Sequence, residues 1–483
     1  MTSAQKKLEE VRPGQWSRTE WGIFLTVVVV LLVNLGQFGA GADTASRNQG
    51  ELAMSMVNDR DLVLDEYVVG IVPGHAATGQ QDLYDRAQCR GHIYSGFPPG
   101  IAFFMVPLYL VLKAALWLLP VATKPALELV VLVMVSAALA AIVSAVSCTL
   151  IYKVASLMAG NRLMAIGATL ALVPASWYFY YSTYISQKTL SAAMLVFAFY
   201  TVIRGTGTFG TAPAHPGRFW LGTGALAGIA LAIDYAPVLV AAILGVYITW
   251  HNGLRALGLF TLGMLPMVGA TGLYHTLAFG GPFTTAYSWR VVIDGIGAAP
   301  SLQVPDLLRL YGLTLSPGKG ILFYAPWVLL SVVGVFSGLR TQFRRVAGLA
   351  ATIALVAFVF NLSLDEWSGQ GWGPRYFTMA LPFLALMLAF LPNRLQRLLW
   401  PLLVFAALLN LLPVLRDGPA VPGGTIWDNP ITLYGGQILH TGAATYWLRF
   451  FSRNVHQLSP LVLTLLQLVL TALTGVTIWF IWR

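Results

Sequence analysis

An acidic residue, Asp43, follows the first apolar segment of the chain, Trp21–Leu35, after only a few residues. A helix there would hold the carboxylate at the boundary between membrane and water, where it could take a proton from a hydroxyl group as a general base. Partial burial would raise its pKa toward the working range. The plainer interpretation is that Asp43 caps the helix that follows, and both interpretations stay open.

Three cations stand where they could bind an anion. Arg375 follows a Gly-Pro turn, and a guanidinium binds phosphate through two parallel hydrogen bonds. Lys319 lies among glycines and could act as a point charge. Arg290 follows an aromatic stretch that contains Tyr287 and Trp289 and could serve as a shelf for a sugar ring. Each cation could instead contact lipid headgroups.

The polar stretch after Asp43 contains further acidic residues, among them Asp82, a second candidate for acid–base chemistry. The triplet Asp59-Arg60-Asp61 matches the D-x-D pattern of nucleotide-sugar enzymes only superficially, because those enzymes need a soluble α/β domain. We interpret it as a solvated helix end. The seven histidines show no metal-ligand spacing. We therefore expect no metal site and no cofactor, although a divalent cation stays open.

The elements that must position these residues are apolar helices. The chain has 483 residues, of which 57% are hydrophobic and only 10% charged, and its mean hydropathy is +0.71. Continuous apolar runs of about twenty residues recur along it, long enough to cross a bilayer. The sequence therefore predicts an all-α polytopic membrane protein with 11–13 transmembrane helices. The net charge of +10 is scattered between the runs, which argues against a nucleic-acid partner.

The charge distribution predicts one membrane domain over residues 1–483, with residues 1–20 in the cytoplasm. Three polar stretches, 41–97, 279–316 and 416–459, would lie on the opposite side. The first should contain amphipathic interfacial helices, since apolar residues of Glu51–Val57 fall on one side of a helix. The run Leu221–Trp250 is interpreted as two half-helices broken at Asp234-Tyr235-Ala236-Pro237. Cys89 and Cys148 are not expected to pair.

The stretch from Cys89 to Val111 changes from polar to apolar in its middle. Pro98-Pro99-Gly100 should turn the chain into the next helix, because proline suits the first turn of a helix. Arg90, His92 and Tyr94 could then line the rim of a cavity just above the hydrocarbon. They could equally be neighbours of an aromatic anchor at the membrane surface.

Several motifs recur in the order and spacing of a known family. The first polar stretch contains Ser46-Arg47, Leu52-Ala53, Leu62-x-Leu64-Asp65, Asp82, Gly91-His92-Ile93-Tyr94-Ser95, Pro98-Pro99-Gly100 and Pro107-x-Tyr109. Later segments are Tyr274-His275-x4-Gly280-Gly281-Pro282-Phe283 with Tyr287, Ser316-Pro317-Gly318-Lys319-Gly320 with Tyr324-x-Pro326, and Trp367-x-Gly369-x3-Gly373-Pro374-Arg375-Tyr376. Together they resemble bacterial GT-C glycosyltransferases, the membrane relatives of the dolichyl-phosphate-mannose protein mannosyltransferases and the aminoarabinose transferases.

The resemblance implies an inverting transferase that moves a hexose or pentose from a polyprenyl-phosphate donor to a glycan, lipid or protein on the extracytoplasmic face of a bacterial inner membrane. Asp43 would be the catalytic base, and Asp82 a second catalytic residue. The donor would be held by Arg375, Lys319, Arg290, His92 and Tyr94. Tyr287, Trp289 and Trp367 would contact the sugar or the acceptor.

Two departures from the family pattern keep other functions open. Gly96-Phe97 stands where relatives often have an acidic–basic pair, and Gln187-Lys188 where they often have an acidic residue or a histidine. An inactive scaffold subunit of a membrane complex and a transporter or flippase of lipid-linked sugars are the alternatives. An enzyme needs an open cavity with a phosphate-binding cation, whereas a scaffold would fill that space with side chains.

Overall fold

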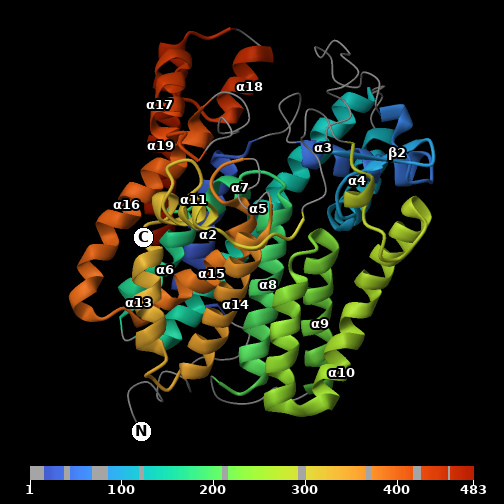
Figure 1. Ribbon diagram of the computed structural model, residues 1–483. Coiled ribbons are helices and arrows are strands. Elements are labelled where there is room, and N and C mark those ends of the chain that lie inside the picture. Colours follow the sequence, from blue (N-terminus) through green and yellow to red (C-terminus); the bar gives the residue numbers. More distant parts are fainter. Residues whose placement is uncertain are drawn as a thin grey trace.

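The computed structural model describes residues 16–36, 44–67, 85–118, 124–159, 161–208, 216–291, 301–365, 371–416, 426–454 and 457–483. These residues are overwhelmingly helical (Figure 1). The elements in chain order are α2 (Arg18–Val33), α3 (Thr44–Asn58), η2 (Asp65–Tyr67), β1 (Arg86–Cys89), β2 (His92–Ser95), α4 (Gly100–Trp117), α5 (Pro125–Met158), α6 (Arg162–Leu172), α7 (Trp177–Ser182), α8 (Gln187–Gly205), α9 (Pro216–Ile233), α10 (Val238–Phe279), η4 (Ala286–Trp289), α11 (Leu307–Thr314), α12 (Ile321–Tyr324), α13 (Val328–Gly338), α14 (Arg344–Ser363), η5 (Arg375–Ala380), α15 (Leu381–Met387), η6 (Leu388–Phe390), α16 (Asn393–Leu415), α17 (Pro430–Thr441), α18 (Tyr446–Asn454) and α19 (Pro460–Trp482).

Six helices in the described part of the chain are long and apolar enough to cross a membrane: α4, α5, α10, α14, α16 and α19. The predicted all-α polytopic membrane protein is therefore confirmed. Other apolar runs are divided into shorter helices, including α6, α13 and the segment Arg375–Phe390. The total of 11–13 crossings stays a prediction.

The run Leu221–Trp250 is broken where the sequence predicted. Helix α9 ends at Ile233 and α10 begins at Val238, so that Asp234 and Pro237 lie in the connection. Proline disfavours an uninterrupted helix, since it lacks the backbone N–H and clashes with the preceding turn. This junction becomes one wall of the site described below.

Helix α10 folds back on itself at Gly253, whose φ of 78° is open to glycine and disfavoured for other residues. A Cβ atom added to Gly245 would lie 3.3 Å from Leu257, although a straight helix would separate these two residues by about 18 Å along its axis. The second arm of α10 packs so closely on α9 that a Cβ at Gly224 would lie 1.9 Å from the carbonyl oxygen of Phe260. Small residues allow this approach of two apolar helices.

The two ends of the bundle can be told apart by their contacts. Near the start of α2, the guanidinium of Arg18 donates to the carbonyl of Arg483 at 2.6 Å. Just beyond the other end of α2, the backbone N–H of Gly36 donates to the carbonyl of Thr183 at 2.8 Å. The first polar stretch therefore begins beside the connection between α7 and α8.

That first polar stretch folds into α3 and a two-stranded antiparallel hairpin, in which Arg86 pairs with Ser95 and Cys89 with His92. Arg90 and Gly91 form its turn, both with positive φ. Helix α3 packs against α4 and α5, and its residues 48–55 are buried inside the protein. Sequence patterns missed the hairpin, because four-residue strands are too short to show an alternation. Cys89 and Cys148 are free and buried, as expected.

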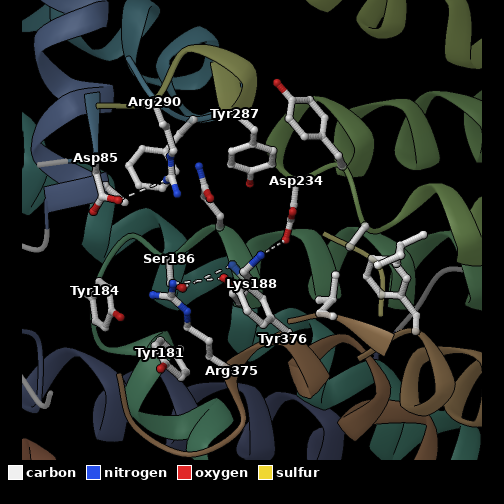
Figure 2. A pocket seen from close by; sticks show the side chains of 18 residues that line it. Asp85, Tyr181, Tyr184, Ser186, Lys188, Asp234, Tyr287, Arg290, Arg375 and Tyr376 are labelled. Carbon is white, nitrogen blue, oxygen red and sulfur yellow. Dashed lines mark hydrogen bonds and ion pairs between the residues drawn. The ribbon is translucent and has the colours of Figure 1, made fainter. Parts of the chain in front are cut away.

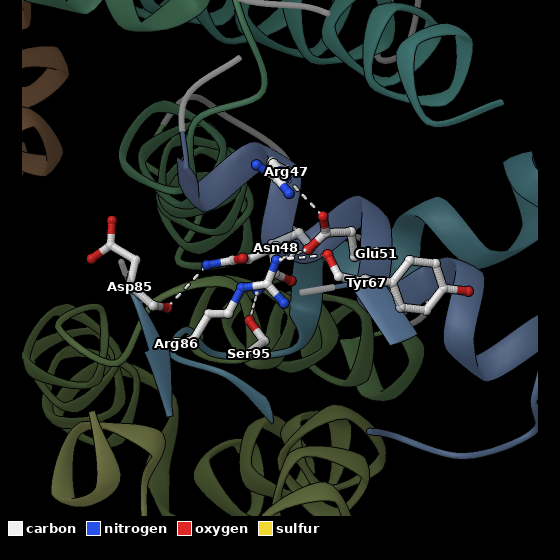
Figure 3. A network of polar contacts seen from close by, with 8 residues as sticks. Arg47, Asn48, Glu51, Tyr67, Asp85, Arg86 and Ser95 are labelled. Carbon is white, nitrogen blue, oxygen red and sulfur yellow. Dashed lines mark hydrogen bonds and ion pairs between the residues drawn. The ribbon is translucent and has the colours of Figure 1, made fainter. Parts of the chain in front are cut away.

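Buried polar contacts fasten α3 to the hairpin (Figure 3). Glu51 accepts from Arg86 at 2.7 Å, and both side chains are almost fully buried. The same carboxylate accepts from Arg47, one turn earlier, at 2.8 Å. The side-chain amide of Asn48 donates to the carbonyl of Asp85 at 3.0 Å. This network holds Asp85, the residue before β1, in a defined place.

The triplet Asp59-Arg60-Asp61 directly follows α3 and stabilises the turn there. Asp61 accepts from Ser55 at 2.7 Å, and the hydroxyl of Tyr67 donates to Asp59 at 3.1 Å. No group of three or more potential metal ligands occurs among the residues that the structure describes. The interpretation of the triplet as a helix end agrees with these contacts.

Candidate functional site

A cavity of about 310 Å³ lies where the first polar stretch meets α8, the α9–α10 junction and the start of η5 (Figure 2). Its polar lining consists of Asp85, Ser186, Gln187, Lys188, Asp234, Arg290 and Arg375 together with Tyr181, Tyr184, Tyr235, Tyr287 and Tyr376. This end of the molecule is the one that contains Gly36, opposite Arg18. The rest of the lining is apolar.

One wall of the cavity carries an ion pair between Asp85 and Arg290, with 3.2 Å between the carboxylate and Nη2. The hydroxyl of Thr44 donates to the same carboxylate. Nε of Arg290 donates to the carbonyl of Gly96 at 3.1 Å. The guanidinium also lies 4.9 Å from the ring centre of Tyr287, a distance typical of a cation–π contact. Arg290 is therefore held in one orientation.

Arg375 reaches into the cavity from the opposite side (Figure 2). Gly373, two residues earlier, has a φ of 62°, and its carbonyl accepts from the backbone N–H of Arg375. Nη2 of Arg375 lies 3.4 Å from the hydroxyl of Tyr376, a weak contact. Its Nε is buried and has no hydrogen-bond partner among the described residues. A buried donor without an acceptor is costly, so the site suits a ligand that brings one.

A second ion pair, between Lys188 and Asp234, forms the third side of the cavity. Nζ of Lys188 lies 2.6 Å from the carboxylate, and both side chains are mostly buried. The ammonium group also lies 4.8 Å from the ring centre of Tyr376. Asp234 thus lies at the end of a half-helix, as the sequence predicted, and also faces a polar cavity.

The described lining residues carry three cations and two carboxylates. Arg290 and Lys188 are each paired with a carboxylate, and Arg375 is the cation left over. A cavity at the boundary of apolar helices with one surplus guanidinium favours an anionic ligand, since low polarity strengthens the attraction.

Lys319 lies behind Arg375 and does not line the cavity. Its Nζ donates to the carbonyl of Gly371 at 2.7 Å. Burial and, to a smaller extent, the positive charge of Arg375 lower the pKa of Lys319 to about 7, and the negative charge of Asp428 opposes this shift in part. Lys319 is therefore charged in the folded protein below pH 7 and neutral above it.

We expect the affinity for a lipid phosphodiester to fall by roughly tenfold between pH 6 and pH 8, because the charge of Lys319 next to Arg375 is lost as the pH rises. A diester is the right probe, since its own charge is constant over this range. Equilibrium binding at several pH values checks this. The control Lys319→Arg should bind the phosphodiester well at both pH 6 and pH 8, and Lys319→Met should bind it poorly at both. An unchanged pH dependence in Lys319→Met would show that another group titrates.

Arg375, Arg290 and Tyr287 of the predicted site residues line the cavity together, and Lys319 lies next to it. Arg290 and Arg375 are 85 positions apart in the sequence. The structure thus brings the main predicted phosphate-binding cations and one aromatic residue into one place.

His92, Tyr94 and Trp289 lie outside this cavity. His92 is exposed and pairs with Asp65 at 2.8 Å. Tyr94 is buried against Phe279 and lines a separate pocket. Asp43, Asp82 and Trp367, which the sequence also proposed, lie outside the described residues.

Among the cavity residues with a charged or amide side chain, four were not among the sequence predictions for the site: Asp85, Gln187, Lys188 and Asp234. Two signals pointed toward them. Asp234 was an acidic residue in an apolar run, and Gln187-Lys188 was a departure from the family pattern. Asp85 carried no signal, because several other acidic residues surround it in the sequence.

No protein-family model and no curated protein matches this chain. Among solved structures, the chain is similar to the crystal structure of ArnT from Cupriavidus metallidurans bound to undecaprenyl phosphate. The alignment covers 96% of this chain and 75% of that one, with 15% sequence identity and a TM-score of 0.49.

Proposed function

We propose that this protein is an integral-membrane glycosyltransferase of the GT-C type that transfers a sugar from a polyprenyl-phosphate donor to an acceptor outside the cytoplasm. The observation that carries the proposal is the guanidinium of Arg375 in the cavity wall, with a buried Nε that has no acceptor among the described residues. The order and spacing of the sequence motifs support the same proposal.

The reaction would proceed by direct displacement. An acceptor hydroxyl oxygen attacks the anomeric carbon of the sugar, and the bond from that carbon to the phosphate oxygen breaks. The phosphate leaves with the bonding electrons, and Arg375 stabilises the additional negative charge. The proton of the hydroxyl passes to a carboxylate, for which we propose Asp43. Attack opposite to the leaving group inverts the configuration.

The described residues next to Asp43 support this assignment. Thr44 donates to Asp85, and Ala45 lines the cavity, so the chain reaches the cavity wall two residues after Asp43. We propose Asp82 as a second acidic residue for this step. Arg290 and Lys319 would add positive charge for the phosphate, and Tyr287 would contact the sugar. His92, Tyr94, Trp289 and Trp367 stay candidates for donor or acceptor contacts outside the cavity wall.

The open cavity also bears on the alternatives. A scaffold subunit that had lost its activity would have no need for paired and unpaired charges around an unfilled space, because buried charges are costly. The transporter or flippase predicts charges buried in the middle of membrane helices. Asp234 instead lies at the end of α9, paired with Lys188.

Transfer of radiolabelled sugar tests the proposal. Full-length protein in lipid nanodiscs is incubated with undecaprenyl-phosphate-linked sugars and with membranes from cells that lack this protein. The wild type should move the label from lipid to acceptor, and Asp43→Asn should lose about 10²–10³-fold in rate. Asp59→Asn is the control, since Asp59 lies outside the cavity. Equal transfer by Asp43→Asn would remove Asp43 from its role, and no transfer with any donor would refute the function.

A further inference from the structure

We infer that Gln187 and the ion pair Lys188–Asp234 bind the sugar of the donor and select an uncharged sugar over a cationic amino sugar. This inference rests on the proposed function and names the substrate class of the same site. The three residues lie on one side of the cavity, at the start of α8 and at the α9–α10 junction.

Gln187, a residue of the cavity wall, has a side-chain donor for which the described residues provide no acceptor. It is the first residue of α8, lines the cavity and is only 7% exposed. Its Nε2 is buried and has no hydrogen-bond partner among the described residues. A buried amide group without a hydrogen bond destabilises the protein, and a ligand oxygen that accepts this hydrogen bond would remove the cost. A hydroxyl, ring or carbonyl oxygen can accept this hydrogen bond, whereas an ammonium group cannot.

Lys188 neutralises the carboxylate of Asp234, which an amino sugar would need as the partner of its ammonium group. Asp234 is a carboxylate in the cavity wall, and alone it would attract a cation. Nζ of Lys188 already occupies it at 2.6 Å, and the surrounding side chains bury both groups. An amino sugar would have to displace Lys188 and leave its charge unpaired, which is strongly unfavourable in a buried place. A neutral hydroxyl can hydrogen-bond to the pair and leave it intact.

The arrangement of the cavity separates this sugar-binding part from the phosphate-binding part. Figure 2 shows Lys188 and Asp234 on one side and the guanidinium of Arg375 beside them, with Tyr376 between the two groups. Arg375 is the lining cation that pairs with no carboxylate among the described residues, and it would bind the phosphate. Tyr376 and Tyr287 supply ring faces, on which the apolar face of a sugar can pack.

Equilibrium binding to the full-length protein in nanodiscs tests the inference with three probes: undecaprenyl phosphate, the same lipid phosphate linked to glucose, and the same linked to glucosamine. The wild type should bind the glucose conjugate about tenfold more tightly than the glucosamine conjugate. Gln187→Ala should weaken binding of the glucose conjugate by about tenfold and leave binding of the sugar-free lipid unchanged. Gln187→Glu should abolish or reverse the preference, because it replaces the donor with an anionic acceptor.

Gln437→Glu is the matched control, since Gln437 is exposed on α17 and lies outside the cavity. It should keep the affinities and the preference of the wild type. The inference is overturned if the wild type binds both conjugates alike, or if Gln187→Ala weakens the sugar-free lipid as much as the glucose conjugate. If the wild type binds none of the three lipids, the proposed function itself is refuted.

Discussion

Replacement of Arg375 by alanine is expected to lower the rate of sugar transfer by about 10²–10³-fold. The guanidinium is the cation in the cavity that no carboxylate among the described residues pairs with, and its Nε has no acceptor there. The leaving phosphate gains negative charge in the transition state, so a donor aimed at it acts on the rate more than on the binding of the substrate. The transfer assay with labelled donor measures kcat and KM separately.

Two further variants make this result specific to the Arg375 guanidinium. Arg375→Lys keeps the charge but loses the fork of parallel donors, and should fall between wild type and alanine. Arg309→Ala removes an arginine on α11 that pairs with Asp306 outside the cavity, and should transfer at the wild-type rate. A loss of activity in Arg375→Ala that is matched by a loss of thermal stability would instead indicate a structural role.

Replacement of Glu51 by alanine should destabilise the protein by about 3–5 kcal/mol. Glu51 and Arg86 form an ion pair with side chains that are 0% and 1% exposed. Without the carboxylate, a buried guanidinium loses its counter-charge in surroundings where water cannot replace it. The midpoint of thermal unfolding in detergent, followed by loss of monodispersity and by circular dichroism, measures the effect.

The double variant Glu51→Leu, Arg86→Met should recover much of the stability, because it removes both charges and keeps the volume. His92→Ala breaks the contact between two exposed side chains, His92 and Asp65, and should cost less than about 1 kcal/mol. A small effect of Glu51→Ala would mean that Arg86 finds another anion. Because Asn48 of α3 holds Asp85, the Glu51 variant should also weaken donor binding.

The sequence predicted those parts of the site that local chemistry marks. Arg375 followed a Gly-Pro turn, and Arg290 followed aromatic residues. The break before α10 was predictable because Asp234 and Pro237 interrupt an apolar run, and neither residue suits the middle of a membrane helix. Each of these inferences needed only a few neighbouring residues.

Pairings between distant segments could not be predicted in this way. Lys188 lies 46 residues before Asp234, and Arg290 lies 205 residues after Asp85. The direction in which a short hairpin aims its side chains was equally hidden, so Tyr94 packs on Phe279 instead of facing Arg375.

The amino-acid sequence by itself determined that this protein is a bundle of apolar membrane helices with a polar first loop, since hydrophobic burial and backbone hydrogen bonding depend on continuous local runs. Only the tertiary structure decided which charges neutralise one another and which donor is left over. That outcome depends on the distances between helices. The order of residues along the chain does not show which helices contact one another across the apolar interior.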